Sequence, residues 1–162
     1  MPDSVCNHTS VGMIILREGQ LLLIERKKFP FGFAPPAGHV DEGETYEAAA
    51  IREVIEEVGL VVNNLTLLYE KDHANKCRRE DGTWHHWCVY KGESLGKLKL
   101  SSEETKSFTW ASKKQFQFLY ERGLAYAAGH IAEDDWVLNP GLEGVWIEIF
   151  DAIMPQIQEE LK

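Results

Sequence analysis

The pattern of apolar and polar residues along the chain predicts five β-strands. The strand-like runs are Ser10 to Leu16, Gln20 to Glu25, Leu60 to Tyr69, Trp84 to Tyr90 and Ser107 to Ala111. Arg17, Glu18 and Gly19 separate the first two runs, so we expect these runs to pair as a hairpin with a glycine-containing turn. The segment that follows, KKFPFGFAPPAG, holds three prolines and two glycines and is expected to form a shaped loop.

Three segments have the pattern of α-helices. The first is expected from Thr45 to about Val58, because Thr45 can serve as the N-cap and Gly59 stands where helices commonly end. The other two are Lys113 to Ile131 and Glu143 to Leu161, joined by the turn-rich stretch DDWVLNPGLEG. The strands come first along the chain, with one helix between them, and the other helices come last. This order predicts an α/β fold in which a mixed β-sheet lies between helices. The length suits a single domain, residues 1–162.

The first predicted helix carries apolar and acidic residues on different faces. At about 100° per residue, four apolar side chains have the spacing of a buried stripe: Ile51, Val54, Ile55 and Val58. Three glutamates share the opposite face: Glu53, Glu56 and Glu57. Ala49 lies on the glutamate face one turn earlier, where its small side chain leaves room for a ligand. Like charges at these spacings repel each other by roughly a few tenths of a kcal/mol per pair, so we expect a compensating charge.

Two interpretations of this acidic face are open. In the first, the glutamates form a solvated surface on which Arg52 pairs locally. In the second, they bind a divalent metal ion. Ligands that are all oxygen atoms favour Mg²⁺ or Mn²⁺, and Mg²⁺ usually keeps several waters and shares the phosphates of a substrate. The residues around the helix favour the second interpretation.

The spacing of fixed residues around the helix resembles the Nudix box. Gly38 is followed by five residues, Glu44, seven residues and then the run REVIEEVGL, which ends at Leu60. The resemblance holds at every defined position from Gly38 to Leu60, and the elements before and after the box are also similar to the family's layout. Ala37 is a departure, since the family often has a glycine there.

The resemblance implies a Nudix hydrolase with the α/β/α sandwich fold of that family. These enzymes cleave the pyrophosphate linkage of a nucleoside diphosphate joined to another group, X. Carried over by position, the ligands of Mg²⁺ or Mn²⁺ are Glu53, Glu56 and Glu57. Glu53 or an acid elsewhere would help to activate water. Glu44 and Arg52 would form a supporting pair, and the loop at Gly38 would place a backbone carbonyl near the metal.

The substrate that we expect is a small nucleotide, either a nucleoside triphosphate or a nucleotide sugar. No proline occurs between Ala37 and Asn139, so the proline that follows the box in many ADP-ribose hydrolases is absent, and we find no marker of another subfamily. The alternative is a catalytically silent Nudix domain that binds a nucleotide or a partner. The intact set of three glutamates argues against it, because a pure binding module has no need of every metal ligand.

Three further residues are candidates for substrate contacts. Arg26 follows the second predicted strand and could meet a phosphate, although charged residues at a strand end are usually solvated. Glu104 precedes the last predicted strand, a region where many Nudix enzymes place an extra catalytic acid. Phe33 could stack on a base, although aromatic residues near a sheet are more often part of the core. The same two interpretations apply to Phe31, Trp84 and Trp87.

Histidines and cysteines raise a second metal hypothesis. A spacing that invites zinc is found in His73, Cys77, His85 and Cys88, although such residues in paired strands are more common without a metal. The three cysteines of the chain form no CxxC pair and are odd in number, which favours reduced thiols. The apolar run from Val11 to Leu16 is too short for a signal-peptide core or a membrane span. We therefore expect a cytoplasmic protein.

The net charge limits the partners of the chain. A formal charge of -9 at pH 7 opposes stable binding to nucleic acid or to an anionic membrane. Together with the lack of a basic tract that is interleaved with aromatic residues, it also disfavours the processing of capped RNA. The partner that we expect is a small-molecule nucleotide. A homodimer is possible through apolar residues near the C-terminus: Trp136, Trp146, Ile147 and Phe150.

Overall fold

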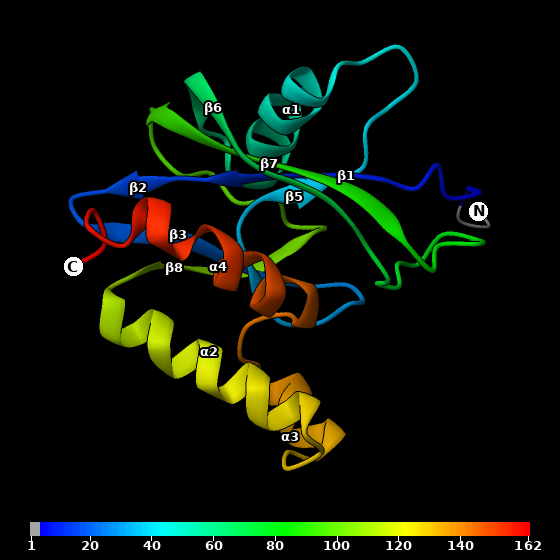
Figure 1. The fold of residues 1–162 in the computed structure, drawn as a ribbon, viewed down its shortest axis with the longest axis vertical. Helices are drawn as coiled ribbons and strands as arrows, with labels where there is room; N and C mark the ends of the chain where they lie inside the picture. Colours follow the sequence, from blue (N-terminus) through cyan, green and yellow to red (C-terminus); the bar gives the residue numbers. More distant parts are fainter. Residues whose placement is uncertain (1–3) are drawn as a thin grey trace. The chain divides into compact units, whose positions relative to one another are not determined.

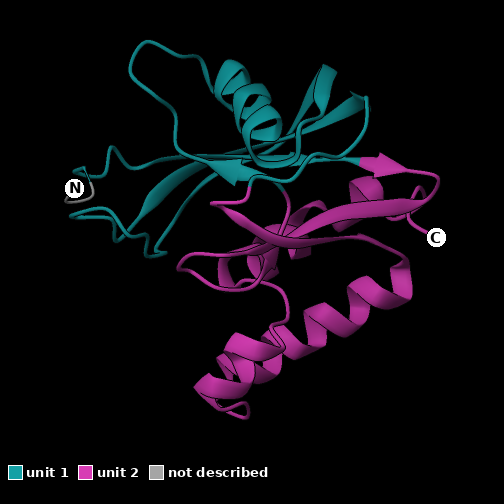
Figure 2. Ribbon diagram, turned by 180° about the vertical axis from the view of Figure 1, so that it is seen from behind, with its two compact units in different colours: residues 1–15, 36–101 teal, residues 16–35, 102–162 magenta. Residues whose placement is uncertain are grey.

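The computed structural model describes residues 4–162, and the fold of the chain is drawn in Figure 1. The chain divides into two compact units, which Figure 2 shows in different colours. The first contains the chain up to Ile15 together with Pro36–Ser101, and the second contains Leu16–Pro35 together with Ser102–Lys162. Each unit has a β-sheet of its own, so the chain enters each sheet from two separate segments. The single domain of residues 1–162 stays a prediction.

The first unit is built on a four-stranded sheet in the order β5-β1-β7-β6. Its strands are β1 (Thr9–Ile14), β5 (Ala37–Gly38), β6 (Val61–His73) and β7 (His85–Leu95). β1 runs parallel to β7 and antiparallel to β5, and β6 is antiparallel to β7. The mixed sheet expected from the sequence is therefore confirmed. The helix α1 (Tyr46–Val58) packs against β1, β5 and β6.

Local signals set both ends of α1, as the sequence predicted. The side chain of Thr45 accepts a hydrogen bond from the Ala48 N–H at 3.1 Å, which satisfies one of the free donors of the first turn. At the other end, Gly59 has a left-handed backbone with a φ of 71°, and its N–H donates to the Ile55 carbonyl at 3.0 Å. A Cβ atom at Gly59 would also lie 2.9 Å from the Cβ of Lys99.

The buried face of α1 differs from the expected one. The buried residues are Ala49, Ala50, Glu53, Val54, Glu57 and Val58. Ile55 is 48% exposed and Ile51 is half-buried, so the apolar stripe that includes them is only partly buried. The predicted apolar and acidic faces do lie on opposite sides of the helix. The side that the sheet buries, however, is displaced from the apolar face toward the glutamates. The reason is that β5 and β1 pack on this side of the helix and bring backbone hydrogen-bond donors to it.

The second unit has its own four-stranded sheet, in which β3 (Gln20–Arg26) is central. β3 pairs antiparallel with three strands, namely β2 (Leu16–Arg17), β4 (Phe33–Ala34) and β8 (Thr105–Ala111). Three helices belong to the same unit: α2 (Lys113–Ala127), α3 (Glu133–Leu138) and α4 (Gly144–Ile157). Ser112 and Gln115 form a reciprocal capping box at the start of α2.

No helix within residues 4–162 is long and apolar enough to cross a membrane.

Several element boundaries differ from the predicted ones. The expected strand from Ser10 to Leu16 is divided, since β1 joins the first sheet and only Leu16 and Arg17 pair with β3. The predicted turn is present, with positive φ angles of 50° at Glu18 and 81° at Gly19. The helix expected to reach Ile131 ends at Ala127. A separate helix, α3, forms where the sequence indicated a turn, and the expected loop before Gly38 contains the short strands β4 and β5.

The proposed dimer surface was wrong. The four apolar residues assigned to it are buried within the chain, with exposed fractions of 3% for Trp136, 0% for Trp146, 8% for Ile147 and 1% for Phe150. Phe150 packs edge-on against Phe116 of α2, with ring centroids 4.8 Å apart. The contact of Phe150 joins α4 to α2. Burial of the four side chains inside the unit already removes their apolar area from water, so they offer no surface to a second copy.

Candidate active site

The carboxylates of α1 lie beside the short strand β5. Glu53 and Glu57 are only 9% and 3% exposed, which is rare for glutamate unless it has partners. Glu57 Oε1 accepts a hydrogen bond from the Ala37 N–H at 2.9 Å. Glu56 is exposed on the next flank of the helix. Of these three glutamates of α1, two are therefore buried and one faces solvent.

Gly38 is the residue that lets Glu53 approach β5. It pairs with Val11 of β1, so its backbone position is set by the sheet. A Cβ atom built at Gly38 would overlap the carboxyl group of Glu53. Only glycine leaves this space open. The structure thus brings together Gly38 and Glu53, which the sequence pattern predicted as neighbours in a metal site.

Arg52 links the acidic residues around this point. Its guanidinium contacts four carboxylates: Glu44 at 2.7 Å, Glu53 at 2.9 Å, Glu56 at 3.1 Å and Asp41 at 3.5 Å. Its Nη2 also donates to the His39 carbonyl at 2.9 Å. Partial burial opposes the charged form, but the hydrogen bonds with Glu44 and Glu53 outweigh it and raise the pKa of Arg52. The predicted Glu44–Arg52 pair is present, and Arg52 stays charged.

The donor chemistry of this site fits a hard divalent cation. One guanidinium shares its charge among four carboxylates, and Glu57 adds a fifth that is almost fully buried. Several acidic groups around one cation leave an excess of negative charge, which is costly in a partly buried place. Clustered carboxylate oxygens are the ligands that Mg²⁺ and Mn²⁺ prefer. Glu53, Glu56 and Glu57 could hold such an ion, with the backbone at Gly38 beside them.

The three predicted substrate contacts belong to the second unit. Arg26, the last residue of β3, donates from Nε to the Pro30 carbonyl at 2.8 Å, and the same atom lies 3.8 Å from Glu143 Oε2. Glu104 is exposed, and its carbonyl accepts a hydrogen bond from the Lys27 N–H at 3.0 Å. The phosphate contact of Arg26 and the role of Glu104 as an additional acid stay predictions.

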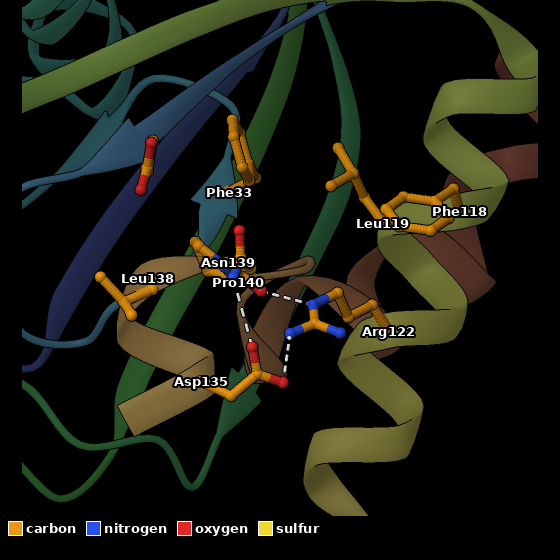
Figure 3. Close-up of a pocket in the computed structure, with 9 residues that line it drawn as sticks. Phe33, Phe118, Leu119, Arg122, Asp135, Leu138, Asn139 and Pro140 are labelled. Carbon is orange, nitrogen blue, oxygen red and sulfur yellow. Dashed lines mark hydrogen bonds and ion pairs between the residues drawn. The ribbon is translucent and has the colours of Figure 1, made fainter. Parts of the chain in front are cut away.

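Phe33 lines a pocket of about 480 Å³ in the second unit (Figure 3). Both apolar and polar residues line it, among them Phe33, Phe118, Leu119, Arg122, Asp135 and Asn139. Arg122 donates to Asp135 Oδ2 at 3.0 Å and also to the Asn139 carbonyl. Sequence analysis missed Arg122 and Asp135. No local pattern connects them, because Asp135 lies on α3, a helix that the sequence did not predict.

The other aromatic candidates divide between core and surface. Trp87 is 5% exposed and donates from Nε1 to Asn75 Oδ1 at 3.1 Å, so it belongs to the core. Trp84 is exposed and stacks on His8, with ring centroids 4.3 Å apart and planes at 4°. Phe31 is also partly exposed. Among these residues, Phe33 has the environment that best suits a stacking role.

The four residues considered for zinc do not form one group. His73 lies 2.5 Å from the hydroxyl of Tyr69 through its Nε2, and Cys88 groups with Glu70 and His86. Cys77 and His85 do come together, but with Cys6 and His39. The latter two escaped the sequence analysis because they lie far from Cys77 along the chain and have no characteristic spacing to it.

Comparisons with known proteins identify the family of the chain. The family model described as the NUDIX domain matches residues 7–131, which is more than half of the chain. A protein of Listeria monocytogenes described as an uncharacterized Nudix hydrolase is 30% identical over 122 residues, covering 72% of this chain and 70% of the relative.

Two further comparisons concern an archaeal enzyme and a solved structure. The ADP-ribose pyrophosphatase of Methanocaldococcus jannaschii is 46% identical over 61 residues, and the match covers 36% of each protein, so the chain spans about a third of this relative. The crystal structure of a MutT NUDIX hydrolase from Burkholderia pseudomallei is 27% identical with a TM-score of 0.54, covering 68% of this chain and 84% of that one. This likeness confirms the expected α/β/α sandwich. The chain belongs to the Nudix hydrolase family, a family of enzymes that act on phosphoric anhydrides.

Proposed function

We propose that this chain hydrolyses the pyrophosphate linkage of a nucleoside diphosphate joined to another group, with a nucleoside triphosphate or a nucleotide sugar as substrate and Mg²⁺ or Mn²⁺ as cofactor. The observation that carries the proposal is the close approach of the Glu53 carboxyl group to Gly38, on a helix that also presents Glu56 and Glu57. Such an arrangement has no structural use of its own, since it buries charge and places the carboxyl group where a side chain at residue 38 would lie.

Each residue of the site has a separate task in this proposal. When bound, the cation neutralises phosphate charge and lowers the pKa of a water molecule. Glu57 is held in one orientation by the Ala37 N–H, which donates to it at 2.9 Å. Arg52 holds the carboxyl groups of Glu53 and Glu56, and Glu44 in turn holds Arg52. Glu53, or an acid elsewhere in the chain, accepts the proton of the attacking water.

Three residues remain candidates for substrate contacts. Phe33 provides an aromatic face in a pocket with hydrogen-bonding groups, which suits a nucleobase. Arg26 is the candidate for a phosphate contact, and Glu104 is the candidate for an additional acid. A Phe33→Ala variant should raise KM more than it lowers kcat, because stacking contributes to the bound substrate and the transition state alike.

The competing hypothesis is a silent Nudix domain that binds a nucleotide without cleaving it. The order around the carboxylates supports the enzyme. Arg52 orients Glu53 and Glu56, and the Ala37 N–H orients Glu57. A binding module gains nothing from this order. The archaeal relative is named as a pyrophosphatase, which supports the same reaction class for this chain. Cytoplasmic location and a small-molecule partner remain part of this proposal.

The test is a phosphate-release screen of the purified chain with Mg²⁺. The substrates are nucleoside triphosphates, nucleotide sugars, dinucleoside polyphosphates and ADP-ribose, each followed by pyrophosphatase or phosphatase to reveal its products. Glu53→Gln should reduce kcat by about 100-fold or more, since it removes a charge at the reacting centre. Glu42→Gln makes the same chemical change at an exposed position of the loop before α1 and should leave turnover unchanged. No hydrolysis by the folded wild-type chain would support the silent domain instead.

A further inference from the structure

Two cysteines and two histidines of the first unit converge on one point outside the carboxylate site. The residues are Cys6, His39, Cys77 and His85, which we call the Cys₂His₂ cluster. One sulfur or nitrogen atom from each lies within 4.8 Å of all the others. The four residues come from four separate places: the segment before β1, the residue after β5, the loop between β6 and β7, and the first residue of β7. The cluster is therefore formed by the tertiary fold and not by residues that are neighbours in the sequence.

The distances inside the cluster match those around a tetrahedral zinc ion. Zn–S bonds of about 2.3 Å and Zn–N bonds of about 2.0 Å place two sulfurs about 3.8 Å apart and a sulfur and a nitrogen about 3.5 Å apart. The Sγ atoms of Cys6 and Cys77 are 3.8 Å apart. Cys6 Sγ lies 3.3 Å from His85 Nε2 and 3.7 Å from His39 Nε2. A simple thiol–imidazole hydrogen bond would explain one of these contacts but not all three.

Neighbouring groups orient the His85 ring so that its Nε2 can bind a metal ion. Its Nδ1 lies 3.2 Å from Asn75 Oδ1. The same oxygen accepts a hydrogen bond from Trp87 Nε1 at 3.1 Å, and because an indole N–H can only donate, this contact identifies the atom as the oxygen of the amide. Nδ1 of His85 therefore carries the hydrogen, and Nε2 presents its lone pair toward the cluster. Zinc-binding histidines commonly have such a partner on the other ring nitrogen.

The backbone around both cysteines also favours the binding of a metal ion by their sulfur atoms. The N–H of His8 donates to Cys6 Sγ at 3.3 Å, a contact that stabilises negative charge on the sulfur. Cys77 begins a tight turn, in which its N–H donates to the Gly82 carbonyl at 2.9 Å. A side chain at Gly82 would overlap Cys77 Sγ, so glycine keeps the sulfur free to face the cluster.

We propose that Cys6, His39, Cys77 and His85 bind a structural Zn²⁺ ion. Two thiolates and two imidazoles in a tetrahedron are a typical donor set for zinc and a poor one for Mg²⁺. Cys6 and His85 are buried at 5% and 1% exposure, and with four protein ligands no position is left for a substrate. The site is therefore closed and structural.

The zinc site reaches the carboxylate site through one residue. His39 follows Gly38 directly, and its carbonyl accepts a hydrogen bond from Arg52 Nη2 at 2.9 Å. Zinc bound to the His39 ring would hold this peptide in place and would also tie it to the N-terminal segment and to the loop before β7. The ion thus supports the loop that carries Gly38 without taking part in the reaction.

Metal content of the whole, untagged chain is the first test. The protein is expressed in ordinary medium, treated briefly with EDTA to remove weakly held ions, desalted and analysed by mass spectrometry for metals. We expect about one zinc per chain. If the folded chain contains less than about a tenth of that amount and also takes up no zinc when it is supplied, the proposal is wrong.

Single substitutions locate the ion. Cys6→Ser and Cys77→Ser should lose the zinc, whereas Cys88→Ser should keep it, because Cys88 is an equally buried cysteine outside the cluster. Glu53→Gln should keep it as well. Zinc retained by both cluster variants, or lost in Glu53→Gln, would place the ion elsewhere and overturn the assignment.

Two further measurements do not depend on whether the cysteine variants fold. Wild-type chain loaded with Co²⁺ should show the strong visible bands of a tetrahedral ion and the charge-transfer band of cobalt thiolate; a spectrum without them contradicts the site. Asn75→Ala leaves all four ligands in place but removes the partner of His85. It should weaken zinc affinity by about 10-fold to 100-fold in competition with a chromophoric chelator. An unchanged affinity would argue against His85 as a ligand.

Discussion

At the scale of single residues, the candidate active site depends on the absence of a side chain at Gly38. The Glu53 carboxyl group occupies the space that a Cβ atom at Gly38 would need. Because that carboxyl group ends a flexible side chain, a larger residue would displace it more readily than it would disrupt the sheet. Gly38 therefore governs the position of a reacting group more than it governs stability.

This distinction predicts the behaviour of Gly38→Ala. The variant should fold with nearly the wild-type melting temperature, but kcat should fall by about 100-fold, since a displacement of about 1 Å at a reacting group has an effect of that size. Gly144→Ala is the matched control, because a Cβ atom there meets nothing within 4 Å. Thermal unfolding and the phosphate-release assay separate the two effects. Full activity in Gly38→Ala would contradict the position assigned to Glu53.

Glu143 predicts a pH dependence of stability. Burial raises its pKa, and the nearby charge of Arg26 opposes the shift with a smaller effect. The folded state therefore binds this proton more tightly than the unfolded state. Its contribution to stability is fully present below the ordinary pKa of 4.5 and is lost as the pH rises through the raised value.

The variant Glu143→Gln should remove this dependence. Its free energy of unfolding should fall less than that of the wild type between about pH 4 and pH 8. Urea unfolding at several pH values measures the difference. Glu148→Gln, at an exposed position on α4 just after Glu143, serves as the control. Equal slopes in Glu143→Gln and the wild type would show that Glu143 titrates normally.

At the scale of elements, α1 shows how local and tertiary signals combine. Its ends were predicted correctly because each depends on residues within one turn: the side chain of Thr45 at the start and the left-handed Gly59 at the end. Its buried face was predicted only in part: Val54 and Val58 are buried as expected, but apolar Ile55 is exposed and acidic Glu57 is buried. Periodicity indicates that two faces exist, but the strand that packs on the helix decides which one is covered.

The N-cap of α1 can be tested directly. Thr45→Ala removes the oxygen that accepts the Ala48 N–H and should lower the free energy of unfolding by about 1 kcal/mol. Thr45→Ser keeps a hydroxyl group in the same place and should cost much less. Urea unfolding of both variants measures the effect. A loss in Thr45→Ser as large as that in Thr45→Ala would mean that the hydroxyl group is not the stabilising group.

At the scale of the whole molecule, the chain carries two kinds of candidate metal site with different ligands. Carboxylates of α1 suit a hard cation that takes part in hydrolysis, whereas the Cys₂His₂ cluster suits a structural zinc ion. The two differ in exchange as well, because a closed site with four protein ligands releases its ion slowly while a site that shares water and phosphate exchanges freely.

Removal of the divalent cation should therefore abolish activity without unfolding the chain. EDTA added to the assay is expected to stop hydrolysis, and an excess of Mg²⁺ or Mn²⁺ is expected to restore it at once, with no zinc added. Circular dichroism recorded in parallel shows whether the fold persists. Hydrolysis that continues in EDTA, or that returns only with Zn²⁺, would contradict the proposed role of the carboxylates.

The sequence by itself determined the features that depend on short stretches of chain. These include the limits of α1, the turn at Glu18 and Gly19, the three glutamates on one helix, and the box spacing from Gly38 to Leu60 that identified the family. All follow from helical periodicity, capping and turn chemistry, which act over a few residues.

Only the tertiary structure decided which residues meet across the chain. Strand pairing divided the first predicted strand between two sheets and set Gly38 beside Glu53. The same kind of pairing brought Cys6 and His39 to Cys77 and His85, where the sequence had indicated a different set. The physical reason is that contacts between distant segments depend on strand register and on the face that each element buries, and one residue's shift in register reverses every side chain.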